Sequence, residues 1–250
     1  MTNLSPSQIS VGAGVSALSG GLLWLERTRS LIAADVHLGY EEVIGGALPL
    51  WSSGPSVASL SDAAKALGAA EIVLLGDVIH GATLSAGARR RISDVLRTLR
   101  TFARVELIAG NHEGKSRGTA VLGQTHEALV RDDWLLLHGD RPTLTARAII
   151  GHLHPSLHLG GDESVSVFLA SRRLIVVPAL TPYSRGLDVR SDECLRALGA
   201  WNIRAKDVQV VAASRADLFA LGTLSTLRTG FGRAAPPRNR FQRKFLQPDR

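Results

Sequence analysis

Short runs of apolar residues recur along the first 150 residues, and each one ends abruptly at a glycine or a polar residue. The runs cover residues 31–34, 72–75, 105–109, 134–137 and 148–150. Runs of this length, bounded in this way, are typical of buried β-strands. We therefore expect five core strands in this part of the chain.

Two amphipathic patterns lie between these runs. Apolar residues recur at helical spacing from Val57 to Leu67, directly after Pro55 and a candidate N-cap at Ser56. A second helical pattern covers Ile92–Leu99. Strands that alternate with helices favour an α/β fold. Arginines surround the second pattern, namely Arg89, Arg90, Arg91, Arg97 and Arg100.

After about residue 165 the pattern changes to β-structure. Short β-like runs cover residues 164–170, 173–177, 208–212 and 218–221 and are joined by turns. We expect these runs to add a second, more antiparallel sheet. No internal repeat and no linker interrupts the pattern, so we expect one domain over residues 1–229.

Composition excludes several classes of protein. Hydrophobic residues make up 45% of the 250 and charged residues 20%, which excludes global disorder. A single cysteine, Cys194, gives no sign of a disulfide-stapled secreted protein. The N-terminus has no basic residue before Arg27, unlike a signal peptide, and no run of about 18 apolar residues occurs. We interpret the chain as a soluble cytoplasmic protein without a membrane segment.

The net charge of +7 is unevenly distributed. Residues 230–250 carry +5, whereas residues 1–229 carry +2. The basic stretch contains Pro236-Pro237 and little periodicity, so we expect a disordered or loosely attached tail. Such a tail suits salt-sensitive contact with nucleic acid.

Polar residues with metal-binding side chains follow each of the first five predicted strands. The carboxyl ends of strands are where ligand groups collect in open α/β sheets. On extended backbone, residues i and i+2 point the same way, so both members of an Asp-x-His or His-x-His pair can reach one region. The clusters are Asp35-Val36-His37, Gly76-Asp77, Gly110-Asn111-His112-Glu113, His138-Gly139 and Gly151-His152-Leu153-His154.

Oxygen and imidazole ligands without thiolates suit manganese, iron(II) or zinc. Two ions can be held if one carboxylate bridges them. Each residue also has a plainer interpretation: Asp35 and Asp77 as helix caps, Asn111 and His112 as turn residues, and Glu113 as a solvated carboxylate. Four histidines at strand ends are hard to explain as coincidence. For Arg89-Arg90-Arg91 a solvated helix face and a phosphate-binding edge both stay open.

This order of motifs resembles the calcineurin-like metallophosphoesterase superfamily. The sequence around Ala34–Glu42, His80 after Gly76-Asp77, and Val177–Pro182 is similar to the small phosphoesterases of archaea and of bacterial DNA-ligase-associated repair clusters. The resemblance implies a four-layer α/β sandwich, with two mixed β-sheets flanked by helices. It implies one metal held by Asp35, His37, Asp77 and His154, and a second held by Asp77, Asn111, His138 and His152.

The resemblance also implies a mechanism and a substrate. A hydroxide bridging two ions, most simply Mn²⁺ with Fe²⁺ or Zn²⁺ as alternatives, would attack phosphorus. His112 would help the leaving group depart and Glu113 would orient His112. The bacterial branch implies an endonuclease that acts on single-stranded or looped DNA, with ligase and helicase repair partners. Candidate substrate-binding residues are His80, Lys115, Arg117, Arg141 and Arg185.

Two other functions stay open. A phosphomonoesterase or cyclic-nucleotide phosphodiesterase would use the same ligands on a different phosphoester. A scaffold that keeps the fold without catalysis is the alternative from another class. None of the expected metal ligands is missing, which favours an enzyme.

Overall fold

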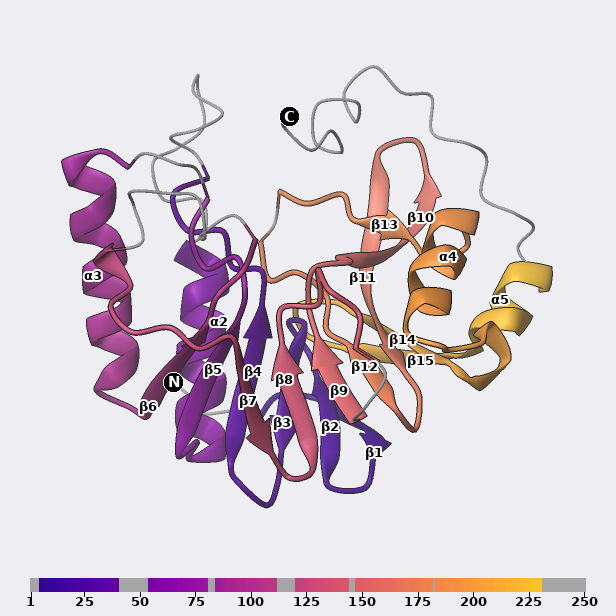
Figure 1. The fold of residues 1–250 in the computed structure, drawn as a ribbon, viewed down its shortest axis with the longest axis horizontal. Helices are drawn as coiled ribbons and strands as arrows, with labels where there is room; N and C mark the ends of the chain where they lie inside the picture. Colours follow the sequence, from indigo (N-terminus) through magenta and orange to yellow (C-terminus); the bar gives the residue numbers. More distant parts are fainter. Residues whose placement is uncertain are drawn as a thin grey trace.

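Two β-sheets face each other and helices cover their outer faces (Figure 1). This computed structural model describes residues 5–40, 54–80, 84–111, 120–143, 147–181 and 183–230. The expected α/β sandwich with two mixed sheets is confirmed. The predicted tail lies outside the described residues, except for Gly230 at the end of the last helix.

The first sheet has six strands in chain order. Its first four strands are antiparallel neighbours, and the last three are parallel. The sequence analysis missed the first three strands, which are four or five residues long and joined by tight turns. The strands are β1 (Gln8–Gly12), β2 (Val15–Leu18), β3 (Leu22–Leu25), β4 (Ser30–Ala34), β5 (Glu71–Leu75) and β6 (Arg104–Ile108).

The second sheet has nine strands and is mixed. Seven of its strands are hydrogen-bonded side by side in the order β13-β10-β11-β12-β9-β8-β7, and among them β12, β9 and β8 run parallel to one another. The other two strands form a branch, in which β14 pairs with β11 and β15 pairs with β14. The strands are β7 (Ala128–Arg131), β8 (Trp134–Leu137), β9 (Arg147–Ile150), β10 (Pro155–Gly160), β11 (Glu163–Ala170), β12 (Leu174–Val176), β13 (Leu187–Asp188), β14 (Gln209–Ala213) and β15 (Leu218–Thr223).

The helices lie outside the sheets. The first expected helix begins at or before Gly54, so Ser56 lies inside it and the predicted N-cap is wrong. Ser85 caps the second, because its hydroxyl accepts a hydrogen bond from the Ala88 amide at 3.1 Å. None of the described helices is long and apolar enough to cross a membrane. The helices are α2 (Gly54–Leu67), α3 (Ala86–Arg100), α4 (Asp192–Ala200), α5 (Leu224–Gly230) and the 3₁₀ turn η2 (Ala205–Asp207).

Alternating side chains build three apolar layers. Along β4, Leu31 and Ala33 pack toward α2 and α3, whereas Ile32 and Ala34 pack toward the second sheet. The central layer also contains Trp134 of β8. The third layer lies between the second sheet and the helices α4 and α5. Because both faces of these strands are buried, their sequences are continuous apolar runs, which is why the pattern predicted them.

The two sheets meet at the carboxyl end of β4. The segment after β12 crosses to the first sheet, where Ala179 forms a parallel bridge with Ala34. The Leu180 amide donates to the Ala34 carbonyl at 2.8 Å, and the Thr181 amide to the Asp35 carbonyl at 3.3 Å. The carboxyl ends of β4, β5, β6, β8 and β9 therefore gather in one place.

At the opposite end of the strands, a buried carboxylate ties the sheets together. Glu71, at the start of β5, accepts two hydrogen bonds from Arg131 of β7, at 2.7 and 2.8 Å. Arg104 donates at 2.8 Å and Ser30 at 2.9 Å. Burial works to raise the pKa of Glu71, but these hydrogen bonds outweigh it and lower the pKa to about 2.

We predict that Glu71→Gln lowers the free energy of unfolding by roughly 3 kcal/mol at pH 7. The pKa of Glu71 is depressed in the fold, so its contribution is present above the unfolded value and is lost between pH 4.5 and about pH 2. Denaturant unfolding of both proteins across this range measures the difference. Glu163→Gln, at an exposed position of β11, is the matched control. An equal loss in the control, or a difference that persists at pH 2, contradicts the prediction.

Candidate metal centre

The strand ends bring all seven predicted ligands into one connected cluster. Asp35, Asp77 and Asn111 follow β4, β5 and β6 of the first sheet, in that order. His138 follows β8 of the second sheet, and the segment 152–154 follows β9. Of these side chains, Asp35, His37, Asp77 and His138 are buried.

One group converges on the imidazole of His138. Its Nε2 lies 2.8 Å from Asn111 Oδ1, 3.1 Å from His152 Nδ1 and 3.5 Å from Asp77 Oδ2. These four residues are the ones expected around the second ion. They come from four different strand ends, so only the assembled fold can bring them together.

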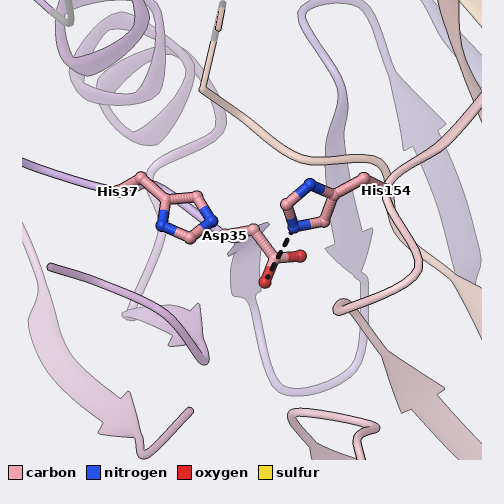
Figure 2. Close-up of side chains that lie close together, drawn as sticks. All are labelled: Asp35, His37 and His154. Carbon is pink, nitrogen blue, oxygen red and sulfur yellow. Dashed lines mark ion pairs between the residues drawn. The ribbon is translucent and has the colours of Figure 1, made fainter. Parts of the chain in front are cut away.

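The second group surrounds Asp35 (Figure 2). His154 Nε2 lies 3.5 Å from Asp35 Oδ1. The imidazoles of His37 and His154 meet edge to face, with ring centroids 5.4 Å apart. The other carboxylate oxygen of Asp35 accepts a hydrogen bond from the His152 amide at 2.8 Å. The Asp35 carboxylate thus contacts the backbone of the segment after β9 and faces the imidazoles of His37 and His154 (Figure 2).

Two sets of donor atoms are close enough to share an ion. Asp35, His37 and His154 form one set, and Asp35, Asp77 and His138 form the other, with the donor atoms of each within 4.8 Å of one another. The two sets have Asp35 in common. The sequence analysis expected Asp77 to bridge, and that role stays a prediction.

Two buried polar atoms show that the residues fit metal ions. Asp35 Oδ1 and His138 Nδ1 are inaccessible to solvent and have no hydrogen-bond partner. They lie 3.6 Å apart. An unpaired buried carboxylate oxygen costs free energy, and a divalent cation among these donors would offset that cost. Carboxylates, an amide and imidazoles without a thiolate are ligands that manganese, iron(II) and zinc accept.

The electrostatics keep most ligands in the form that binds metals. Burial lowers the pKa of His138 to about 4 and also lowers that of His152, so both imidazoles are neutral at pH 7. Burial works to raise the pKa of Asp35, but the neighbouring imidazoles outweigh it and lower the pKa. For His154 burial works to lower the pKa, but the Asp35 carboxylate outweighs it and raises the pKa.

The ligand backbone is left-handed, not extended. Asp35 has a φ of 49° and His37 of 48°. His152 and His154 have values of 61° and 43°, and Asp77 of 40°. The expectation of extended Asp-x-His and His-x-His segments is therefore wrong. Such angles are uncommon in residues other than glycine, and strain of this kind gathers at functional sites.

Glycines beside the ligands allow this close approach. A Cβ atom on Gly76, which has a φ of 74°, would lie 2.0 Å from His138 Nδ1. On Gly110 it would lie 2.0 Å from Asp77 Oδ1. Each of these glycines thus leaves room for a ligand that belongs to another motif or strand.

Further side chains orient the ligand imidazoles. His80 Nδ1 lies 3.0 Å from His37 Nδ1, and Ser184 Oγ lies 2.7 Å from His154 Nδ1. Such contacts leave the other ring nitrogen available to a metal. Sequence reasoning missed Ser184, because it lies 30 residues beyond His154 and a serine beside a motif gives no sign of which imidazole it contacts.

The candidate substrate-binding residues have different surroundings. His80 is buried against His37, as described above. Arg141 is exposed and lies 3.7 Å from Asp140. Arg185 donates to the Gly161 carbonyl at 2.6 Å and pairs with Asp162 at 3.3 Å, so it is tied to the tip of the β10–β11 hairpin. The other candidates, His112, Glu113, Lys115 and Arg117, lie outside the described residues.

A solved structure resembles the fold of this chain, whereas sequence comparisons find no match. No model of a known protein family matches the chain, and no curated protein matches it. The crystal structure of the nuclease MPE from Pseudomonas putida superposes with a TM-score of 0.67 and 22% identity, over 87% of this chain and 100% of that one. This chain has the fold of that nuclease. The expected α/β sandwich with two mixed sheets is therefore also found in a solved structure.

A second structure is less similar. Yfce, a phosphoesterase from E. coli, superposes with a TM-score of 0.40 and 14% identity, over 78% of this chain and 97% of that one. At 22% identity the nuclease shares the fold with this chain, and its similarity extends no further than the fold.

The glycine beside His138 provides a test of the metal centre. We predict that Gly76→Ala lowers the affinity for Mn²⁺ at least about tenfold, because the new methyl group displaces the His138 imidazole. Gly123→Ala is the matched control: its φ of 76° gives the same backbone strain, but a Cβ there meets nothing within 4 Å. Calorimetric Mn²⁺ titration of both variants measures the effect. Equal affinities would show that the ligands do not depend on this approach.

Proposed function

We propose that this chain is a dinuclear metal-dependent phosphodiesterase, and specifically an endonuclease that acts on single-stranded or looped DNA. The observation that carries the proposal is the convergence of seven side chains with oxygen and nitrogen donors from five strand ends, among which two buried atoms have no hydrogen-bond partner. A purely structural role for these side chains does not explain why neither atom has a hydrogen-bond partner.

The two groups of donors suggest which residues hold which ion. Asp35, His37 and His154 would hold one, and Asn111, His138 and His152 the other, with Asp77 between them. Two bound divalent ions supply Lewis-acid stabilisation of phosphoryl charge and a water of lowered pKa for attack on phosphorus. Manganese is our first choice, with iron(II) and zinc as alternatives.

The protein supplies fixed positions and low solvent exposure. The buried ligands sit in a region of low effective dielectric, where charge stabilisation is stronger than in water. His138 and His152 are neutral there at pH 7, so these imidazoles do not repel a metal ion electrostatically. Asn111 is exposed and marks the side of the cluster that a substrate can reach.

We propose DNA as the substrate, repair as the process and the cytoplasm as the location. Three kinds of support bear on DNA and repair. The motif resemblance points to phosphoesterases of ligase-associated repair clusters, with ligase and helicase partners. The nuclease MPE shares the fold. A positively charged chain, with a net charge of +7, suits a polyanionic substrate.

Removal of a ligand should abolish activity. We predict that Asp77→Ala and His138→Ala each lower Mn²⁺-dependent hydrolysis of bis-(p-nitrophenyl) phosphate more than about a hundredfold, because loss of a ligand exceeds the usual effect of losing an outer partner. Rate measurements with circular dichroism as a folding check test this. Asp217→Ala, at an exposed turn, is the control and should keep full activity. Wild-type rates in either ligand variant would count against the proposal.

His112 should act on the leaving group and not on the metals. We predict that His112→Ala keeps its Mn²⁺ content but loses turnover about a hundredfold on a single-stranded oligonucleotide, whose leaving alkoxide needs a proton. Hydrolysis of bis-(p-nitrophenyl) phosphate should fall much less, since nitrophenolate departs without one. Parallel losses on both substrates would remove His112 from this role.

A further inference from the structure

Four arginines form a stripe along one face of α3. At 100° per residue, Arg89, Arg90, Arg97 and Arg100 fall within a sector of about 100°. All four are exposed, whereas the opposite face is buried in the layer against the first sheet. We call these four residues the α3 stripe. From Arg89 to Arg100 the stripe is about 16 Å long at 1.5 Å per residue.

Most of this stripe is not used inside the protein. Arg97 pairs with Asp94 on the same helix. Within the described parts of the chain, the guanidinium groups of Arg89, Arg90 and Arg100 make no hydrogen bond or ion pair. If these arginines served solubility alone, acidic residues one helical turn away would stabilise the helix by pairing with them. The only acidic residue of α3 is Asp94, so most of the arginines lack such a partner on the helix.

The charge of the folded body is concentrated here. Five arginines and one aspartate give α3 a formal charge of +4, although residues 1–229 together carry +2. The rest of that body is therefore slightly acidic, at −2. Among the described helices, α3 therefore carries the highest positive charge, which attracts a strand of phosphates.

The helix starts at the end of the first sheet where the metal centre lies. α3 connects the carboxyl end of β5, which carries Asp77, to the start of the parallel β6, so its N-terminus lies at the site end. A Cβ on Gly39 would lie 3.2 Å from Leu84 and 3.8 Å from Ile92. Gly39 is two residues from His37. The helix that carries the stripe thus runs away from the end of the sheets where the metal centre lies, along the outside of the molecule (Figure 1).

We propose that the α3 stripe binds the phosphate backbone of a nucleic-acid strand that flanks the bond to be cleaved. Guanidinium groups match phosphate oxygens in geometry and charge, and contacts of this kind fix register without reading sequence. The inference rests on the proposed function for its substrate. It adds a binding track outside the metal centre, and hence a preference for polymers over small phosphoesters.

The test compares two triple variants of the full chain with equal loss of charge. Arg89→Gln/Arg90→Gln/Arg100→Gln removes the unpaired part of the stripe, and glutamine preserves helix propensity. Arg172→Gln/Arg173→Gln/Lys206→Gln is the control. Its residues line a basic cleft of about 710 Å³ beside the start of β12, at the end of the sheet away from the metal centre.

Binding of a fluorescein-labelled single-stranded DNA is measured by anisotropy between 50 and 200 mM salt, with EDTA present so that no cleavage occurs. We expect the stripe variant to bind at least about tenfold more weakly at 50 mM salt. The slope of log K against log salt should become shallower by about 2, at about 0.7 per lost contact. The control variant should keep the wild-type slope.

Three outcomes overturn the proposal: wild-type binding by the stripe variant, equal weakening in both variants, or a weaker affinity with an unchanged slope. Equal weakening would mean that net charge alone attracts the strand. Hydrolysis of bis-(p-nitrophenyl) phosphate by the wild type tests the proposed function separately. The DNA-binding result can therefore contradict the α3 stripe while hydrolysis supports the metal centre. Conversely, absent hydrolysis can contradict the metal centre while the binding result supports the stripe.

Discussion

The close approach of two sheet ends around the imidazole of His138 is the constraint on which the rest of this structure depends. The imidazole occupies the space where Gly76 lacks a side chain, and its two nitrogens face Asp35 on one side and Asn111 on the other. An extra methyl group at Gly76 would displace this imidazole. The donors can converge only because the backbone here accepts strain that ordinary packing would avoid.

The cost of this arrangement is offset elsewhere in the fold. Unpaired buried atoms and left-handed ligand residues destabilise the site end of the strands. At the opposite end, Glu71 and its arginine partners join β5 to β7 across the two sheets. Three apolar layers hold the sheets between these two ends. The interactions at the Glu71 end of the sandwich thus stabilise a fold whose other end carries the strained metal centre.

Much of the fold and of the candidate site could be predicted from the sequence. The core strands are doubly buried, so each is an unbroken apolar run, and the polar residue that ends the run lies at the shared edge. Asp35, Asp77 and His138 could be found in this way. The hairpins of β1–β3 could not, because their strands are short and their register depends on tight turns.

Other features depend on contacts that local patterns do not contain. Ser184 reaches His154 only because the segment after β12 crosses to the first sheet. The left-handed angles of Asp35 and His37 arise from the meeting of the sheets, whereas their spacing alone suggested extended backbone. Arg185 looked like a phosphate ligand beside a motif, but the hairpin tip holds it.

The central claim is that these side chains hold two cations, and a crystal structure with Mn²⁺ tests it most directly. Anomalous scattering locates manganese independently of any assumption about the ligands. The account predicts two peaks, one among Asp35, His37 and His154 and the other among Asn111, His138 and His152, with Asp77 next to both. No peak at this cluster, or manganese bound only elsewhere on the molecule, would contradict it.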